Sequence, residues 1–150
     1  MILHMGTRTT EPVRVSYKTL EPDESEASAV SELLAEIQSQ LGYQTLRYDH
    51  SILVYYDPPE TTNRRRELLI PLSGDVEGID TKVFPGTRTA FLVFDGAEIS
   101  VDVYYQRLME YMEQVKLEPT GDIYSIEIMY VPEDLDYADY TMEIMVPVKG

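Results

Sequence analysis

A single glutamate stands in the middle of an apolar strand pattern, residues 124–131 (YSIEIMYV). β-Branched and aromatic residues at this density indicate a β-strand. Because strand side chains alternate between two faces, Glu127 shares a face with Met129, and Ile126 and Ile128 point the other way. Two interpretations follow. Either the face of Glu127 is wet and the carboxylate is solvated, or this face forms a half-enclosed apolar pocket.

The second interpretation makes Glu127 a candidate for chemistry. An apolar pocket removes water from the carboxylate, which is costly unless a cation or a proton compensates the charge. Groups kept in such surroundings are enriched at binding and catalytic sites. Glu127 would then select cationic ligands or activate a water molecule.

The composition fits one folded domain with a core of its own. The chain has 150 residues, 43% of them hydrophobic, and no cysteine. This length and composition argue against global disorder, and the absence of cysteine is compatible with a reducing cytoplasm, the expected location. No apolar run approaches the roughly 18–20 residues of a membrane span, and MILHMGTRTTEP lacks the pattern of a signal peptide.

The net charge of −15 disfavours direct nucleic-acid binding, because such a surface repels phosphates. The basic run Arg64 to Arg66 follows a turn-like DPPETTN segment and is interpreted as a solvated loop or the start of a strand. An acidic field instead concentrates cations, whether small molecules or basic protein surfaces. His4 and His50 are the only histidines, so no metal site and no cofactor are expected.

The chain contains the same unit twice. Four pairs of segments align at an offset of 74 residues, or 76 for the last pair: 13–17 with 87–91, 34–37 with 108–111, 51–58 with 125–132, and 67–74 with 143–150. Segments repeated in the same order at nearly one spacing indicate two structural repeats. We place the repeats at 11–74 and 85–148 of one domain, 11–150, and expect residues 1–10 to be a tail free to be disordered.

Each repeat has the pattern of a strand, a helix and two strands. The predicted strands are 13–20, 52–57 and 67–72 in the first repeat and 87–94, 123–131 and 140–148 in the second. The predicted helices have apolar stripes at helical spacing. One starts at the acidic run Asp23 to Glu26 and ends at Gly42, and the other covers about 100–117. These elements predict an α+β fold in which a curved antiparallel sheet carries two helices on one face. Ile126 and Ile128 are expected against the helices, and the opposite face is expected to form a groove between the repeats.

Several segments resemble the GyrI-like small-molecule-binding domain family, which also forms the effector-binding part of AraC-type and MerR-type multidrug-responsive transcription regulators. They are VFPGTRTAFLVFDG with the tyrosine-rich helix after it, YSIEIMY, YTMEIMVPVKG, EPVRVSY and SILVYYDPPE. The resemblance covers the chain from Glu11 and implies a duplicated βαββ fold with a ligand groove between the repeats. It differs from the regulators in one respect. Only ten residues precede the domain, so no helix-turn-helix and no direct DNA binding are expected.

The resemblance also implies a site. The family's key acidic residue, which meets cationic ligands, falls on Glu127, and a second acidic residue, whose part in ligand contact varies, falls on Glu143. By alternation, Leu53, Tyr55 and Met129 lie on the face of Glu127. The candidate pocket aromatics are Tyr55, Tyr104, Tyr105 and Tyr130, although alternation also allows Tyr130 to be core. Tyrosine is amphipathic and a good cation–π partner, and the chain has 12 tyrosines and no tryptophan.

Three functions remain open from the sequence. The first is a stand-alone module that binds amphipathic, cationic aromatic molecules for sequestration or effector sensing. The second, implied by the resemblance, is a hydrolase of electrophilic cyclopropane-bearing compounds, in which Glu127 activates water and a pocket tyrosine assists the leaving phenolate. The third is a protein inhibitor of the kind that binds DNA gyrase. Turnover separates the second function from the first, and complex formation without a small ligand identifies the third.

Overall fold

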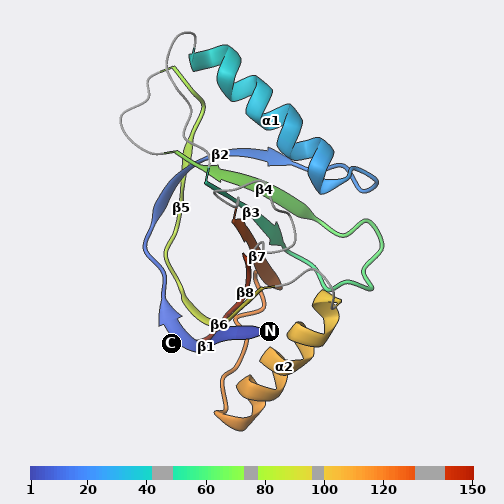
Figure 1. Cartoon of the computed structure of the whole chain (residues 1–150), viewed down its shortest axis with the longest axis vertical. Helices are drawn as coiled ribbons and strands as arrows, with labels where there is room; N and C mark the ends of the chain where they lie inside the picture. The colour runs from blue at the N-terminus through green and yellow to red at the C-terminus, as the bar shows by residue number, and fades with distance from the viewer. Residues whose placement is uncertain (42–48, 73–77, 96–99, 131–140) are drawn as a thin grey trace.

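The computed structural model describes residues 1–41, 49–72, 78–95, 100–130 and 141–150, which form one antiparallel sheet and two helices (Figure 1). In chain order the elements are β1 (Ile2–Thr9), β2 (Val13–Thr19), α1 (Glu26–Leu41), β3 (His50–Tyr55), β4 (Arg66–Pro71), β5 (Lys82–Phe84), β6 (Arg88–Asp95), α2 (Val101–Gln114), β7 (Ser125–Tyr130) and β8 (Thr141–Pro147). The strands lie in the order β1-β6-β8-β7-β3-β4-β2-β5. The expected α+β fold with two helices is confirmed.

The strand–helix–strand–strand order occurs twice, as β2-α1-β3-β4 and as β6-α2-β7-β8. The two units meet at the centre of the sheet, where β3 pairs with β7 and Leu53 lies opposite Glu127. These two residues are also related by the offset of 74, as expected if a twofold axis passes between the two strands. The exact repeat boundaries, 11–74 and 85–148, remain a prediction that superposition of the two units would test.

The expected N-terminal tail is wrong for Ile2–Thr9, which form β1. This strand pairs with β6 from Ile2 opposite Phe94 to Thr9 opposite Arg88, and the Met5 side chain packs against the core beneath α2. Pairing with β1 satisfies backbone groups that the edge of β6 would otherwise leave open. The short strand β5 holds the equivalent place beside β2. The strand that leads into each unit is therefore bound to the other unit.

Both helices cover the same face of the sheet, at opposite ends of it in Figure 1. The residues that α1 buries follow the i, i+4 spacing of one helix face: Ala29, Leu33, Ile37 and Leu41. Those of α2 do the same: Tyr104, Leu108 and Met112. Leu53 packs beneath α1 and Ile144 beneath α2, and both pair with Glu127 and so share its face. Among the described residues, no helix is both long and apolar enough to cross a membrane.

The opposite face has an apolar core of its own, to which neither helix contributes. Its buried members are Val15, Ile52, Val54, Leu69, Phe91, Ile126, Ile128 and Met145. The expectation that Ile126 and Ile128 lie against a helix is therefore wrong, and Glu127 faces the helices instead. The middle strands are apolar on both faces, so alternation correctly separated the two sets of side chains but could not tell which set the helices cover.

Two chain segments cross at the edge of this second core. The backbone N–H of Thr10 donates to the carbonyl oxygen of Thr87 at 2.8 Å, and the N–H of Thr87 donates to Thr10 Oγ1 at 2.9 Å. Gly86 permits this crossing, because a Cβ at this position would overlap the Thr10 carbonyl oxygen. The connection from β1 to β2 is thereby held against the connection from β5 to β6.

Candidate functional site

Glu127 lies at the centre of the sheet on the face that carries the helices. Its neighbours in the ladder are Leu53 on β3 and Ile144 on β8, both of them buried. The Glu127 side chain itself is only partly buried. A carboxylate therefore rises from an apolar floor in the region between α1 and α2.

The first helical turns of α2 hold this carboxylate. The phenol oxygen of Tyr105 lies 2.6 Å from Glu127 Oε2 and 3.0 Å from the hydroxyl oxygen of Ser125. The phenol has one proton, and the charged carboxylate is the stronger acceptor for it. Burial, followed by the nearby negative charge of Glu127, raises the pKa of Tyr105 well above its usual range. Tyr105 therefore stays protonated and acts as a hydrogen-bond donor to Glu127.

A tyrosine and an arginine stand next to this pair. Tyr55 lies opposite Ser125 in the ladder and so shares the face of Glu127. The guanidinium carbon of Arg64 lies 3.8 Å from the centre of the Tyr55 ring and 5.6 Å from that of Tyr124. Arg64 Nε also donates to the carbonyl oxygen of Asp57 at 2.7 Å. A planar cation of the protein thus rests on Tyr55, close enough for its charge to act on Glu127.

The electrostatics of this cluster reflect a partly dehydrated acid. Burial raises the pKa of Glu127, the bond from Tyr105 opposes the rise, and a second carboxylate, Glu26, adds to it. The positive charge of Arg64 acts in the opposite direction. Burial also raises the pKa of Glu26, which begins α1, and it raises the pKa of Tyr55 to about 12, with a further contribution from Glu127. The cluster would gain from another positive charge.

The structure separates the predicted site residues into three groups. Leu53, Tyr55, Tyr105, Glu127 and Met129 share the helix face. The Tyr104 ring instead stacks on Phe94 at 3.8 Å in the core, and its hydroxyl oxygen accepts a bond from the N-terminal amine. Tyr130 and Glu143 lie on the opposite face, where they bond to each other. The predicted groove in which all of these residues meet is therefore not what the fold builds.

Four residues that the sequence interpretation left out of the site belong to this cluster: Glu26, Arg64, Tyr124 and Ser125. Ser125 begins the strand that carries Glu127, and Tyr124 directly precedes it. Both residues could have been found by extending the strand pattern. Arg64 was interpreted as part of a solvated loop, and Glu26 as part of an acidic helix start. Neither residue had a sequence signal for its position near Glu127, because both approach the carboxylate through the tertiary fold.

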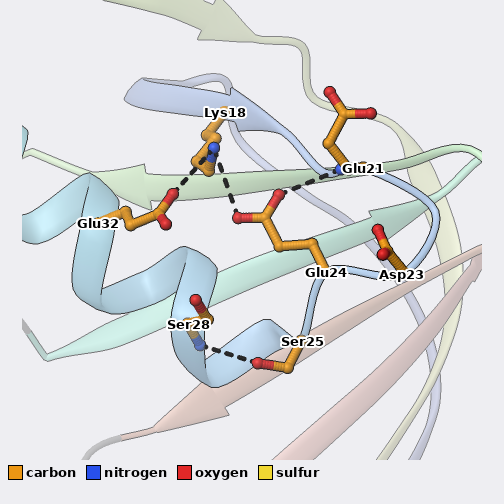
Figure 2. A pocket seen from close by; sticks show the side chains of 7 residues that line it. All are labelled: Lys18, Glu21, Asp23, Glu24, Ser25, Ser28 and Glu32. Atoms are coloured by element: carbon orange, nitrogen blue, oxygen red, sulfur yellow. Dashed lines mark hydrogen bonds and ion pairs between the residues drawn. The ribbon is translucent and has the colours of Figure 1, made fainter.

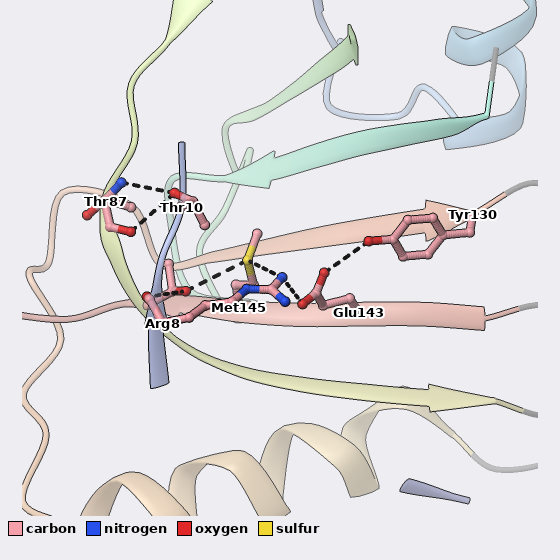
Figure 3. A network of polar contacts seen from close by, with 7 residues as sticks. Arg8, Thr10, Thr87, Tyr130, Glu143 and Met145 are labelled. Atoms are coloured by element: carbon pink, nitrogen blue, oxygen red, sulfur yellow. Dashed lines mark hydrogen bonds and ion pairs between the residues drawn. The ribbon is translucent and has the colours of Figure 1, made fainter. Parts of the chain in front are cut away.

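The opposite face carries two matching polar clusters, one from each unit. Glu143 is 1% exposed, pairs with Arg8 and accepts a bond from the Tyr130 hydroxyl at 3.2 Å (Figure 3). Glu67, the repeat partner of Glu143, is 7% exposed and pairs with Lys82 at 2.7 Å. Its other oxygen accepts a bond from the Tyr56 hydroxyl at 3.0 Å, as Glu143 does from Tyr130. One cluster joins β1, which precedes the first unit, to β8 of the second unit. The other joins β5, which precedes the second unit, to β4 of the first, so both clusters have a structural role.

An open acidic depression lies at the start of α1 (Figure 2). Its volume is about 500 Å³, and seven polar or charged side chains line it. Lys18 lies 3.5 Å from Glu24 and 3.3 Å from Glu32, and the backbone N–H of Ser28 bonds to Ser25 Oγ at 3.2 Å. These contacts pair Lys18 with two of the four carboxylates and satisfy one backbone N–H at the helix start, in line with the interpretation of the acidic run as a helix start. The depression lacks the apolar walls of a ligand pocket.

A smaller and more apolar cavity, of about 180 Å³, borders the cluster around Glu127. It is lined by Met109, one helical turn beyond Tyr105 on α2, and by Tyr124, whose ring faces Arg64. Tyr56, Ile123 and Val146 complete most of its wall. Aromatic and apolar surface is therefore available beside Tyr124, at the edge of this cluster.

The fold that the resemblance predicts is shared with several solved structures of low sequence identity. The C-terminal domain of EcmrR superposes with a TM-score of 0.74 at 18% sequence identity, over 97% of this chain and 97% of that chain. A hydrolase from Listeria innocua gives a TM-score of 0.65 at 11% identity, over 97% and 91%. SAV2435, whose structure holds tetraphenylphosphonium, gives 0.51 at 13% identity, over 99% and 95%. Identities this low establish the fold alone. No family model matches the sequence, and a search of curated proteins gave no match.

Proposed function

We propose that this protein binds amphipathic, cationic aromatic small molecules between α1 and α2. The observation that carries the proposal is the place of Arg64, whose guanidinium lies on the Tyr55 ring and acts on Glu127. The protein itself thus puts a planar cation where a ligand cation would find an aromatic ring and a carboxylate together. Cation–π attraction and a partly dehydrated acid favour the same class of ligand.

Each element of the site has a distinct part in this proposal. Glu127 supplies the negative charge, and Tyr105 fixes its orientation. Tyr55 supplies a stacking surface, Met129 adaptable packing, and Tyr124 the aromatic wall toward the neighbouring cavity. Arg64 neutralises the empty site and is displaced by the ligand. The tetraphenylphosphonium held by SAV2435, a protein of the same fold, supports this class of ligand.

The test compares a cation with a neutral molecule of similar shape. Tetraphenylphosphonium and triphenylphosphine oxide are titrated by calorimetry into the unmodified protein and into Glu127→Gln. Removal of one partner of a buried charge pair costs roughly 2–5 kcal/mol, so the phosphonium should bind at least about thirtyfold more weakly. The affinity for the neutral oxide should fall by less than about threefold, because its stacking surface remains.

Glu110→Gln is the matched control, because Glu110 is exposed on α2 and the substitution changes the net charge equally. Equal weakening in Glu110→Gln would show that the general acidity of the surface attracts the cation, which contradicts the proposal. A cation preference that 0.5 M salt abolishes in the unmodified protein would contradict it too, because salt screens exposed charges much more than buried pairs.

A hydrolase acting on strained electrophiles is a second candidate, favoured by the 2.6 Å contact between Tyr105 and Glu127. Glu127 would take a proton from a water molecule as the water oxygen attacks a cyclopropane carbon. Tyr105 would donate a hydrogen bond to the phenolate oxygen that forms when the ring bond breaks. Glu127→Gln should then slow turnover of such a compound at least about a hundredfold. Equal turnover in the variant would remove Glu127 from catalysis.

A further inference from the structure

A second cavity, partly open to solvent, lies on the opposite face of the sheet from Glu127. Its volume is about 170 Å³. The floor is formed by side chains of the three central strands: Ile52 from β3, Ile126 and Ile128 from β7, and Met145 from β8. Val13 and Phe84 also line the space, and Thr10, Glu11 and His50 supply its polar atoms.

The chain crossing described above borders this cavity through Thr10. Thr10 is bonded to Thr87, and Val13 pairs with Phe84 through the ladder between β2 and β5. These contacts hold residues 10–13 and Phe84 at the cavity above the apolar floor. Figure 3 shows Thr10 and Thr87 bonded to each other, with Met145 on the neighbouring strand β8. The walls of the cavity are therefore parts of the folded sheet and of the connections at its edge.

The size and lining of the cavity define the ligand that it can hold. Apolar cavities of about 150 Å³ stay dry and take up a benzene ring, so this one suits a single ring or a small fused ring. The Asp49 carboxylate lies 2.6 Å from His50 Nδ1 and favours the tautomer with a proton on that nitrogen. His50 Nε2 is then an acceptor, and Glu11 is a second one at the rim. A ring with one hydrogen-bond donor matches both features.

We propose that this cavity is a second ligand site, which takes compact neutral aromatic molecules with one hydrogen-bond donor, such as phenols and indoles. The site is independent of Glu127. Alternation along β7 points Ile126 and Ile128 into the cavity and Glu127 toward the helices, so the sheet separates the two ligands. A molecule in the cavity does not compete with a cation at Tyr55.

The experiment follows the isoleucine and methionine methyl groups of the full chain by NMR during titration with p-cresol and, separately, with indole. Saturable shifts are expected for Ile52, Ile126, Ile128 and Met145, with a dissociation constant on the order of 1 mM or tighter for a ligand of this size. Ile144, on the helix face, is the internal control. The same shifts should appear in Glu127→Gln and in the presence of saturating tetraphenylphosphonium.

Two variants change the cavity in opposite directions. Val13→Phe fills the cavity and should weaken the binding of p-cresol at least about tenfold. Binding of tetraphenylphosphonium should stay unchanged within twofold. Ile128→Ala enlarges it and should shift the preference from p-cresol toward indole by at least about fivefold. If one variant fails to fold, the other and the methyl map of the unmodified protein still decide the question.

Some outcomes would overturn the proposal. They are shifts centred on Ile144 instead of the cavity methyls, shifts that grow linearly without saturation, and displacement of p-cresol by tetraphenylphosphonium. A failure of the cation to bind anywhere would contradict the proposed function of the Glu127 site and leave this site unaffected. The two proposals therefore fail separately.

Discussion

The two repeats are alike on one face of the sheet and differ on the other. On the face away from the helices, Tyr56, Glu67 and Lys82 form the same cluster as Tyr130, Glu143 and Arg8. Even the stacking recurs, because Lys82 lies 4.7 Å from the ring centre of Tyr17 and Arg8 lies 4.3 Å from that of Phe91. On the helix face, the repeat partner of Glu127 is the buried Leu53. Duplication thus preserved the pairs that hold the sheet together, and the candidate site lies where the repeats diverge.

The three carboxylates also differ in their partners. Glu143 and Glu67 each have a cation of the chain in direct contact. Within the described ranges, no ion pair reaches Glu127, which instead accepts a hydrogen bond from the neutral phenol of Tyr105. Burial alone therefore does not identify a binding carboxylate. A carboxylate that already pairs with a cationic side chain of the protein has a structural role. A carboxylate held by a neutral donor can still accept a cation from solution.

The largest effect is expected from breaking the symmetric ion pairs. Arg8→Ala leaves a carboxylate that is 1% exposed without its cation. Loss of one partner of a buried pair costs 3–5 kcal/mol. Because the Arg8 side chain is 42% exposed, we expect the lower end, about 3 kcal/mol in the free energy of unfolding. Lys82→Ala should cost about 2 kcal/mol, since Glu67 is more exposed than Glu143 and can regain water.

Urea denaturation measures both values, with Arg107→Ala on the exposed side of α2 as the control, expected within about 0.5 kcal/mol of the unmodified protein. A change this small for Arg8→Ala would mean that the pair is not structural, and the comparison of the two faces would fail.

The second effect tests whether the two faces can be separated. Gly86→Ala forces a Cβ into the carbonyl oxygen of Thr10, and the strain of moving the backbone should cost about 2 kcal/mol. The variant should also weaken the binding of p-cresol in the cavity and leave the affinity for tetraphenylphosphonium within twofold of that of the unmodified protein. Gly6→Ala is the control, because its Cβ would meet only the Phe91 ring at 3.5 Å, an ordinary contact. Equal losses of both ligands in Gly86→Ala would show that the faces do not act independently.

The third effect concerns pH. Burial raises the pKa of Glu127 in the folded protein, so its contribution to stability is fully present below the unfolded pKa, near pH 4.3, and is lost as the pH rises through the folded pKa. Glu127→Gln removes that loss and keeps an acceptor for Tyr105. The variant should match the unmodified protein at pH 4 and become more stable above that range, by about 1.4 kcal/mol for each unit of raised pKa.

Urea denaturation of the variant and the unmodified protein at several pH values between 4 and 7 checks this. Glu110→Gln should show no such trend. A stability difference that stays constant with pH would mean that Glu127 is as well hydrated as an ordinary surface acid.

The smallest effect concerns Arg64. If it occupies the place of the ligand cation, Arg64→Gln should bind tetraphenylphosphonium about threefold to fivefold more tightly, since exposed cation–π contacts contribute about 0.5–1 kcal/mol. Arg65→Gln is the matched control, because Arg65 has the same charge on the same loop but pairs with Asp57 at 2.8 Å. Equal affinities in the two variants would show that the internal cation does not compete.

The architecture could be predicted from the sequence, because the strand–helix–strand–strand pattern occurs in it twice. The 74-residue offset that aligns Leu53 with Glu127 also pairs them in the ladder between β3 and β7. The sequence was insufficient for the side of the sheet that the helices cover, because Ile126 and Leu53 are equally apolar and both are buried. Strand β1 was missed for a related reason. The residues that it pairs with on β6 lie 79 to 92 positions further along the chain, from Thr9 opposite Arg88 to Ile2 opposite Phe94, and local pattern does not report such pairings.

The site shows the same division between local and distant information. Adjacent positions of a helix point about 100° apart, so Tyr104 and Tyr105 could not both face Glu127, and the apolar stripe of α2 that includes Leu108 assigns Tyr104 to the core. That much was available from the sequence. The approach of Arg64 to Tyr55 was not, because it depends on the geometry of a turn whose DPPETTN sequence allows many conformations.

The exchange of leading strands between the two units has a consequence for how the protein folds during synthesis. β1 leaves the ribosome first, yet its partner β6 follows only after the first unit is complete, and β8, which lies between β6 and β7, comes last. The N-terminal unit therefore cannot complete its strand pairing before β6 and β7 of the second unit have emerged. β1 exposes unpaired backbone until β6 emerges, and the edge of β3 does so until β7 emerges. The facing edges of β6 and β7 then wait for β8, and in these intervals the nascent chain depends most on protection from aggregation.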